Sequence, residues 1–589
     1  MDKMIFSLIK YTKKSGLIIL LAALPSILIR AQKFVDVTTQ AGIQHQYKPY
    51  EGTFGGGACI LDINNDGYED IFLTGGQNED ALYLNVKNGT FKNIFASSGL
   101  KLSTKYITSG AVSADINKDG LVDLFITTIT KAGSADKIPR AENLLFLNTG
   151  NNQFKDATKQ FGLDEFSTFS TGAAFGDINA DGYPDLFVSN YFQDYSGQIN
   201  IMNESMIVGS GKSGKPLLFI NKKGKYFEEC SEKYNLKERG FGFGGSFTDV
   251  DNDNNLDLIV FNDFGYKAMP NKVYHNNYPD NSFTEVSDKI NLNLGINAMG
   301  LAIGDFNNDG YLDYFFSNIR SNQLLQNQGN KKPFINQSTG KGIAYPFSAD
   351  SLGRYITISW GCNFGDFDND GDLDLFVANG CFNPNVEPNP DNYFENVNGQ
   401  FSNKSFAAGL DNSGIGRGSV IFDYDTDGDL DLLVVNQKPV YPGFEKTDAY
   451  TTLYKNETAG KNWIKVSLSG KESDTKGLGA KIFLYCRNKI MVRETDGGSS
   501  HLSQSTIVAH FGLDTITTID SIKTTWPGGK KQVVKNPTTN QLLIINEISS
   551  PEKRYPVFKY TLLFSLLVIA IALISFRIKK NITPSVSSR

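Results

Sequence analysis

The chain has 589 residues, which exceeds one ordinary domain and requires either several domains or a repeat array. Hydrophobic residues make up 40% of it, as in folded proteins, while 57 glycines and abundant Asn and Asp indicate many turns and an all-β class. The formal net charge is −6, and residues 32–589 carry −10 because residues 1–31 are basic. This acidic part has no basic stripe, so we expect no nucleic-acid partner.

Residues 1–31 have the pattern of a signal peptide. Lysines precede an apolar run from Leu17 to Ile29, and a candidate cleavage point follows Ala31. Ile29 is a poor match to the small residues that usually precede such a point, so an uncleaved anchor is the alternative. Either way, the sequence predicts that the body of the protein is exported.

A nine-residue pattern with Asp or Asn at alternating positions, DINNDGYED in its first copy, returns seven times, 53 to 72 residues apart. The copies begin at Asp62, Asp115, Asp177, Asp249, Asp305, Asp366 and Asp423. A glycine-rich apolar strand precedes each copy and a second apolar strand follows it. This spacing suits a four-stranded blade with the pattern in the first hairpin.

The remaining two strands of each unit are also visible. A third strand ends in Asn, as in LYLN from Leu82, and a fourth begins with Phe, as at Phe91. The last unit lacks its fourth strand, but Phe34 to Val37 supplies a matching one at the other end of the chain. Completion of one unit from both ends predicts a closed ring, a seven-bladed β-propeller over residues 32–460. An open array of hairpins or separate small sandwiches is the alternative.

The repeated loops have the chemistry of calcium sites. Positions one, three, five and nine offer side-chain oxygens and position seven its carbonyl, the hard ligands that calcium prefers. An EF-hand is rejected because no Glu stands at position twelve and strands flank the loop. The expected ligands are Asp62, Asn64, Asp66, Tyr68 and Asp70; Asp115, Asn117, Asp119, Leu121 and Asp123; Asp177, Asn179, Asp181, Tyr183 and Asp185; Asp249, Asp251, Asp253, Asn255 and Asp257; Asp305, Asn307, Asp309, Tyr311 and Asp313; Asp366, Asp368, Asp370, Asp372 and Asp374; and Asp423, Asp425, Asp427, Asp429 and Asp431.

Up to seven Ca²⁺ ions are therefore expected. Occupancy is least certain in the fourth loop, where Asn254 replaces a glycine, although Asn tolerates a left-handed backbone. The alternative is that these residues only form turns. Carboxylates at positions one, five and nine in all seven copies favour metal binding, because without a cation they would repel one another.

The units resemble FG-GAP (VCBS) repeats, the blade unit of integrin α-subunit propellers, through the loops and the strands GAAFGD from Gly172 and GGSFTD from Gly244. Residues 461–548 alternate apolar and polar positions and are predicted to form a small β domain. WIKVSLSG from Trp463 and TTWPGGKKQ from Thr524 make it similar to ASPIC/UnbV domains. The combination resembles the cartilage acidic protein family, which implies extracellular binding or adhesion and no established catalysis.

The last residues indicate a membrane anchor. Tyr560 to Phe576 is apolar throughout, so after a linker at 549–556 we expect a transmembrane helix over 557–578 and a cytoplasmic tail over 579–589. The five cysteines are too few for disulfides to be the main stabilisation of the fold. Cys362 and Cys381 either form a disulfide or are buried thiols, like the other three.

The sequence favours a membrane-anchored, extracytoplasmic protein that binds a protein or glycan on the face opposite the calcium loops. The connections between second and third strands, which lie on that face, are long and contain aromatic residues that we expect to be exposed, although we expect some of them only to pack the loops. These are Tyr191, Phe192, Tyr195, Phe264, Tyr266, Phe382, Tyr441 and Phe444. The alternatives are a calcium-dependent polysaccharide lyase or hydrolase, and a structural scaffold or assembly factor in the membrane.

The four histidines do not form a recognisable catalytic motif. His501 and His510 in the C-terminal domain are expected to be structural, and His45 and His275 to be surface or packing residues. We therefore predict no catalytic residues.

Overall fold

A computed structural model of the chain describes residues 34–549, except 52–54, 198, 200–203, 345–356, 381–388, 413, 438–449, 459 and 488, together with Ile571 and Ile574. The expected signal peptide lies outside the described residues, as do almost all of the expected linker, membrane span and tail. Among the residues described, no helix is long and apolar enough to cross a membrane.

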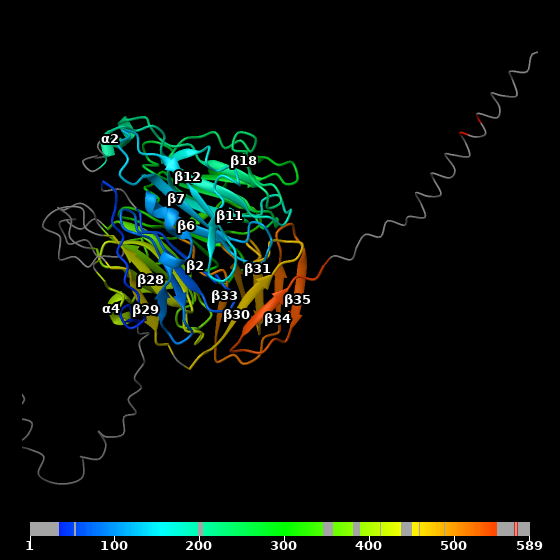
Figure 1. Ribbon diagram of the computed structural model, residues 1–589. Helices are drawn as coiled ribbons and strands as arrows, with labels where there is room; N and C mark the ends of the chain where they lie inside the picture. The colour runs from blue at the N-terminus through cyan, green and yellow to red at the C-terminus, as the bar shows by residue number, and fades with distance from the viewer. Residues whose placement is uncertain are drawn as a thin grey trace, which may run out of the picture. The chain divides into compact units, whose positions relative to one another are not determined.

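The described residues before Asn462 form seven sheets, six with four strands and one with five, and in each the four strands of the repeat lie in the order of the repeat. Figure 1 shows these sheets arranged around the ring. The innermost strands are β2 (Ala58–Leu61), β6 (Tyr106–Ala114), β11 (Ser167–Gly176), β15 (Phe241–Thr248), β19 (Gly300–Gly304), β23 (Ser359–Gly365) and β27 (Gly416–Phe422). The second strands are β3 (Asp70–Leu73), β7 (Asp123–Lys131), β12 (Asp185–Phe192), β16 (Asp257–Asp263), β20 (Asp313–Ser317), β24 (Asp374–Asn379) and β28 (Asp431–Asn436).

The outer half of each sheet is shorter. The third strands are β4 (Ala81–Asn85), β9 (Leu144–Asn148), β13 (Leu217–Asn221), β17 (Lys272–Asn276), β21 (Gln323–Gln326), β25 (Asn392–Val397) and β29 (Thr452–Asn456). The fourth strands are β5 (Phe91–Asn93), β10 (Phe154–Asp156), β14 (Phe227–Glu229), β18 (Phe283–Glu285), β22 (Ile335–Asn336), β26 (Gln400–Asn403) and β1 (Phe34–Asp36). A further strand, β8 (Ala141–Glu142), pairs with β11.

The ring is closed by the first strand of the chain. β1 pairs antiparallel with β29, with Phe34 opposite Asn456, which confirms the displaced strand. Each innermost strand also contacts the innermost strand of the next sheet, and β27 contacts β2. The expected all-β, propeller-like fold is confirmed, because these contacts form a cycle with no open end.

The hydrophobic core lies between neighbouring sheets. One buried cluster joins the first and second sheets and another the fifth and sixth. The closing cluster joins Ile60 and Leu73 of the first sheet to Leu433 and Val435 of the seventh. Burying a side chain of this size contributes about 1.5–3 kcal/mol, so the closing cluster stabilises the ring as the others do.

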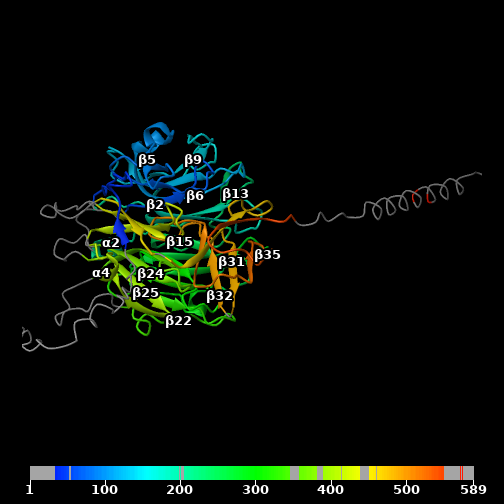
Figure 2. The ribbon, with the colours of Figure 1, turned by 90° about the horizontal axis from the view of Figure 1, so that it is seen from below.

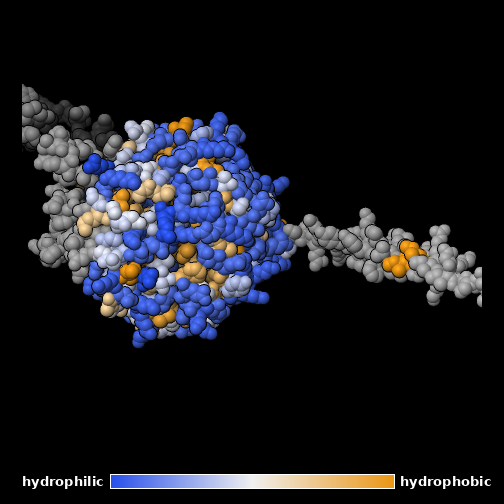
Figure 3. Space-filling model, turned by 90° about the horizontal axis from the view of Figure 1, so that it is seen from above, coloured by the Kyte–Doolittle hydropathy of each residue, from blue (hydrophilic) through white to orange (hydrophobic). Residues whose placement is uncertain are grey.

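Within residues 34–549, the helices that the structure describes are short and lie in the connections. They are η1 (Phe95–Ser97), η2 (Leu100–Lys105), α2 (Glu204–Gly209), α3 (Ser287–Ile290) and α4 (Ser405–Ala408). α2 belongs to the connection between β12 and β13, and in Figure 2 it lies on the side of the ring away from β31 and β35. Figure 3 shows a mostly hydrophilic surface with scattered hydrophobic residues, as expected when the apolar side chains pack between sheets.

The C-terminal domain contains two sheets. One has the order β33-β30-β36 and the other β32-β31-β34-β35. Their strands are β30 (Asn462–Ser469), β31 (Lys481–Cys486), β32 (Lys489–Glu494), β33 (Ala509–Asp514), β34 (Ser521–Thr525), β35 (Lys531–Lys535) and β36 (Leu542–Asn546). The domain has its own core around Trp526, yet it forms one compact unit with the ring, up to Glu547.

Residues 495–508, here called the central segment, join β32 to β33 and reach the innermost strands of the ring. Gln504 donates its backbone N–H to Ala58 O at 2.9 Å and Ser113 donates its backbone N–H to Gln504 Oε1 at 2.6 Å. Further bonds to the central segment come from Phe175, Ser246, Leu301, Cys362 and Ile421, so that all seven innermost strands contact it.

The close approach of the central segment explains why the innermost strands are rich in glycine. A Cβ on Gly57 would lie 2.2 Å from Leu502 O, and one on Gly418 would lie 2.5 Å from Ser503 Oγ. No side chain fits at these distances, so the glycines are required by the packing at the ring axis.

Four of the cysteines are buried free thiols, as the second of the two alternatives for the cysteines predicts; they are Cys59, Cys230, Cys362 and Cys486. Cys362 is therefore not a disulfide partner, and Cys381 lies outside the described residues. Burial raises the pKa of Cys59 and Cys362 to about 12, which makes both thiols inert.

Candidate metal centres

Five of the seven loops share one network of backbone hydrogen bonds, which the first loop illustrates, and the fourth and seventh loops have part of it. Asp66 donates its N–H to Asp62 Oδ1 at 3.1 Å and to Asn64 Oδ1 at 3.0 Å. Gly67 donates to Asp62 Oδ2 at 2.9 Å and Tyr68 to Asp66 Oδ1 at 3.0 Å. The loop thus turns the side chains of positions one, three and five toward the same interior.

The aspartate at position nine is held from both sides. Asp70 accepts the backbone N–H of Ile63 at 3.0 Å and that of Asn85, the last residue of β4, at 2.7 Å. The corresponding pair of bonds holds Asp123, Asp185, Asp257, Asp313, Asp374 and Asp431. Burial, followed by the neighbouring carboxylates, raises the pKa of Asp70 and Asp123 to about 8, so their ionised forms need a cation.

The loop backbone is left-handed at two positions. Position six has φ from +72° to +94°, and the smallest value is that of Asn254, which confirms that Asn adopts the conformation of the six glycines. Position four is also left-handed, with φ from +51° to +62°, although it carries Asn, Lys, Ala or Thr. A conformation that costs Ala180 and Thr426 free energy is kept in every copy, which points to a fixed function of the loop.

Carboxylates gather most closely in the loops that have four of them. In the fourth, sixth and seventh loops, three carboxylate oxygens lie within 4.8 Å of one another. The groups are Asp249, Asp251 and Asp253; Asp366, Asp368 and Asp370; and Asp423, Asp425 and Asp431. Oδ1 of Asp251, Asp423 and Asp425 is buried and accepts no hydrogen bond from the described residues. Such oxygens fit a hard divalent cation, the group that the sequence predicts.

Lysines contact several of these carboxylates. Lys465 Nζ contacts Asp423, and Lys481 Nζ lies 2.8 Å from Asp249 Oδ2. Lys455 contacts Asp425 and lies 3.1 Å from Asp427 Oδ2. Ammonium groups therefore already compensate part of the negative charge in the fourth and seventh loops, and calcium would compete with them there.

The asparagine that ends each third strand links neighbouring sheets. Asn85 donates Nδ2 to Tyr424 O of the seventh loop at 2.8 Å, and Asn148 donates to Ile63 O of the first loop at 2.8 Å. The same bond is made by Asn221, Asn276, Asn327, Asn396 and Asn456, each to position two of the preceding loop. We call these seven residues the clamp asparagines. The sequence shows that an Asn ends each third strand, but only the structure shows that its side chain bonds to the loop of the neighbouring sheet.

The C-terminal domain covers the loop face of the ring. Thr475 donates Oγ1–H to Asp115 Oδ2 at 2.7 Å, and Gly512 donates its N–H to Asp366 Oδ2 at 2.8 Å. Gly528 donates to Asn254 O at 3.2 Å. Position one of several loops is thus bound by this domain, a contact that the sequence does not reveal.

Five of the aromatic residues expected to be exposed on the other face lie among the described residues, and four of these five are not exposed. Tyr191, Phe192 and Phe264 are buried, so the prediction is wrong for them, and Tyr195 stacks on Phe192 with ring centres 4.9 Å apart. They pack the long connections against the core cluster around Phe241 and Phe243. Tyr266 is exposed, with 48% of its surface accessible. Phe382, Tyr441 and Phe444 lie outside the described residues.

Three histidines are buried and one is not. Burial lowers the pKa of His45 to about 4 and that of His501 and His510 to about 3, so all three are neutral packing residues. His275 is half-buried, and its Nδ1 lies 3.1 Å from Asp257 Oδ1 in the fourth loop, a contact that the sequence does not predict. The signal in the sequence is its position directly before a clamp asparagine.

The comparisons with known proteins agree with this architecture. The model for FG-GAP-like repeats matches residues 62–126, 133–188, 249–316 and 366–434, and the model for ASPIC and UnbV matches residues 470–552. The chain carries FG-GAP-like repeats and an ASPIC/UnbV domain. It is 23% identical to cartilage acidic protein 1 of Homo sapiens over 89% of this chain and 76% of that protein. It is also 23% identical to the T-cell immunomodulatory protein of Rattus norvegicus, over 69% of this chain and 64% of that one.

Solved structures are more distantly similar to this chain. An Agrocybe aegerita lectin has a TM-score of 0.34 and 16% identity, covering 70% of this chain and 91% of the lectin. A Bacillus licheniformis rhamnogalacturonan lyase has a TM-score of 0.36 and 11% identity, covering 76% of this chain and 78% of the lyase. At these scores the likeness carries no argument about function.

Proposed function

We propose that this protein is an exported, membrane-anchored, seven-bladed calcium propeller that binds a protein or a glycan. In this proposal the calcium ions hold the loops of one face, and the ligand binds on the other. Residues 557–578 anchor the chain, with the body outside the cytoplasm and residues 579–589 inside.

The observation that carries the proposal is the repeated donor set. In five loops the backbone turns the oxygens of positions one, three and five toward one interior, as in the first loop, and all seven loops fix position nine with two backbone N–H groups. Buried carboxylate oxygens in the fourth and seventh loops accept no hydrogen bond from the described residues. Oxygen donors at this spacing suit Ca²⁺, which takes six to eight of them at about 2.3–2.6 Å. Bound calcium would supply coordination where burial now disfavours the ionised carboxylates.

The placement of the ligand follows from what covers the ring. The C-terminal domain bonds to loop residues such as Asp115 and Asp366, which supports the other face as the binding surface. The connections on that face include α2 and the exposed Tyr266, whose hydroxyl donates to Glu204 Oε1 at 2.6 Å. Exposed tyrosines on rigid scaffolds are frequent binding hot spots for proteins and stacking platforms for sugars.

The test uses two tyrosines on opposite faces. The purified full-length chain is applied to a glycan array and to a panel of purified extracellular proteins, with calcium and with a chelator. We expect calcium-dependent binding that Tyr266→Ala weakens about tenfold, the loss for a contact of about 1.4 kcal/mol. Tyr226→Ala, which removes a 50% exposed tyrosine from a turn on the loop face, should leave binding unchanged.

Two results would contradict the proposal. Binding reduced by Tyr226→Ala but not by Tyr266→Ala would place the ligand on the loop face. Cleavage of a glycan during the assay would instead support the alternative of a calcium-dependent lyase or hydrolase.

A further inference from the structure

The fourth sheet departs from the other six in two places that lie close together. Asn254 replaces the loop glycine, and the residue before the clamp asparagine is His275. The same strand position is occupied by Leu84, Leu147, Ile220, Gln326, Glu395 and Lys455 in the other sheets. An imidazole thus stands at this position in one sheet of the seven.

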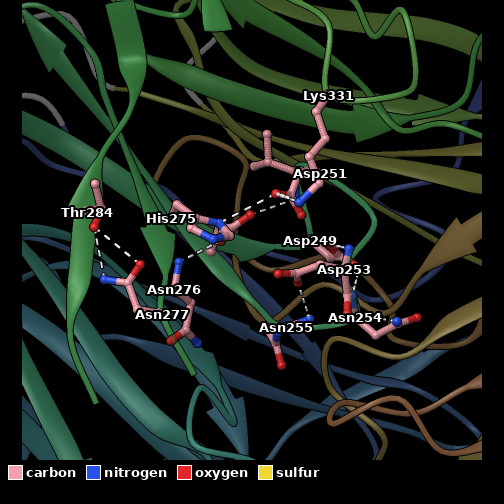
Figure 4. Close-up of polar contacts among 12 residues, drawn as sticks. Asp249, Asp251, Asp253, Asn254, Asn255, His275, Asn276, Asn277, Thr284 and Lys331 are labelled. Carbon is pink, nitrogen blue, oxygen red and sulfur yellow. Dashed lines mark hydrogen bonds and ion pairs between the residues drawn. The ribbon is translucent and has the colours of Figure 1, made fainter. Parts of the chain in front are cut away.

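This strand position faces the loop. In the seventh sheet, Lys455 contacts Asp425 and Asp427 from the equivalent place. In the fourth, His275 Nδ1 lies 3.1 Å from Asp257 Oδ1 and 3.6 Å from Asp251 Oδ2. Figure 4 shows the imidazole turned toward Asp251, with Asp249 and Asp253 beyond it. In the fourth sheet, the side chain at the strand position before the clamp asparagine therefore contacts the carboxylates at positions three and nine of the loop.

The ligand atoms are close enough to share one ion. The donors of Asp251, Asp257 and His275 lie within 4.8 Å of one another, and Asp251 also belongs to the group with Asp249 and Asp253. Oδ1 of Asp251 is buried and accepts no hydrogen bond from the residues that the structure describes. Asp257 is 1% exposed in its side chain, so one ligand is fixed in the protein interior.

A cavity provides access to this cluster. Its volume is about 160 Å³, and Asp251, Asp257, His275 and Tyr311 contribute to its lining. Lys331 Nζ lies 3.0 Å from Asp251 Oδ2, but the side chain is 66% exposed, so displacing it by a cation would cost little. The cavity has room for the water molecules that complete the coordination of a metal ion held by three protein ligands.

We propose that the fourth loop binds a zinc-class divalent cation through His275 Nδ1 and the carboxylates of Asp251 and Asp257, rather than calcium alone. Imidazole nitrogen is a preferred ligand of Zn²⁺ and Co²⁺, whereas calcium sites are built from oxygen. None of the other six sheets has an imidazole at the corresponding position, which carries an aliphatic residue in three of them, Gln326 or Glu395 in two, and Lys455, itself a cation, in the seventh.

The experiment titrates Zn²⁺ into the full-length chain in saturating calcium by isothermal calorimetry, and repeats the titration with Co²⁺ by visible absorption. We expect one zinc site per chain that His275→Gln weakens at least about tenfold, since even partners outside the coordination shell cause such losses. His275→Ile introduces the residue type of the third sheet, Ile220, and should behave alike. Gln326→Leu, at the same position of the fifth sheet, is the matched control and should change nothing.

Melting temperatures in calcium show whether the His275 variants fold. Absence of a zinc site in the wild-type chain, or zinc affinity unchanged in both folded His275 variants, would overturn the inference. Both outcomes are independent of calcium binding by the other six loops, so a failure here is distinguishable from a failure of the proposed function.

Discussion

Replacing a clamp asparagine should destabilise the ring by an amount that the structure defines. Asn85→Ala removes the Nδ2 donor from Tyr424 O at 2.8 Å and from Glu69 O at 3.3 Å, and removes the acceptor of the Lys87 N–H at 3.0 Å. Tyr424 is buried, and an unsatisfied buried carbonyl costs about 1–3 kcal/mol. We therefore expect a loss of about 2–3 kcal/mol.

The assay is thermal unfolding in saturating calcium. At an unfolding entropy of about 2.1 cal/mol/K per residue, a unit of roughly 500 residues loses about 1 kcal/mol for each degree, so Tm should fall by about 2–3 °C. Asn88→Ala, which removes an exposed asparagine from the same turn, should lower Tm by less than about 1 °C. Asn221→Ala, which removes the clamp between the second and third sheets, should lower Tm by as much as Asn85→Ala. Equal melting of Asn85→Ala and Asn88→Ala would refute the clamp argument.

Three further predictions concern charge and topology. Asp370→Ala should lower Tm in calcium more than Asn64→Ala, because it removes a charged ligand from a four-carboxylate loop, and similar losses would contradict this. In the metal-free protein, burial raises the pKa of Asp70 to about 8, so folding favours the protonated carboxyl. This stabilisation is complete below about pH 3.8, the pKa of an unfolded Asp, and is lost as pH rises to about 8. Tm should therefore be higher at pH 6 than at pH 8, and the difference should vanish in calcium. Protease added outside the membrane should digest the body but spare a tag placed after Arg589, and loss of the tag would place the tail outside.

The ring was predictable because its information is local and repeated. The loop pattern and the strand at Phe34 both follow from residues that recur at fixed spacing, and the structure places Phe34 opposite Asn456 as expected. A single copy would be ambiguous with an ordinary turn, whereas seven copies with the same charged positions are not.

The failures concern contacts between distant parts of the chain. The sequence places Tyr191 and Phe192 in a long connection, but β12 extends to Phe192, and both side chains are buried in the core. The central segment contains residues as polar as Ser499 and Gln504, yet both are buried at the ring axis. Backbone groups of six innermost strands and the hydroxyl of Ser246 in the remaining one, β15, form hydrogen bonds with this segment. His275 lies 18 residues from Asp257, and only the pairing of β16 with β17 brings them together.

The central claim is that the seven loops bind calcium. The most direct measurement compares the melting temperature of the full-length chain in excess calcium with that of the chelator-treated chain at the same pH. A site with calcium at 100 times its Kd adds about 2.7 kcal/mol, so each such site should raise Tm by about 3 °C, and several sites together should raise it by well over 5 °C. Identical melting with and without calcium would contradict the account.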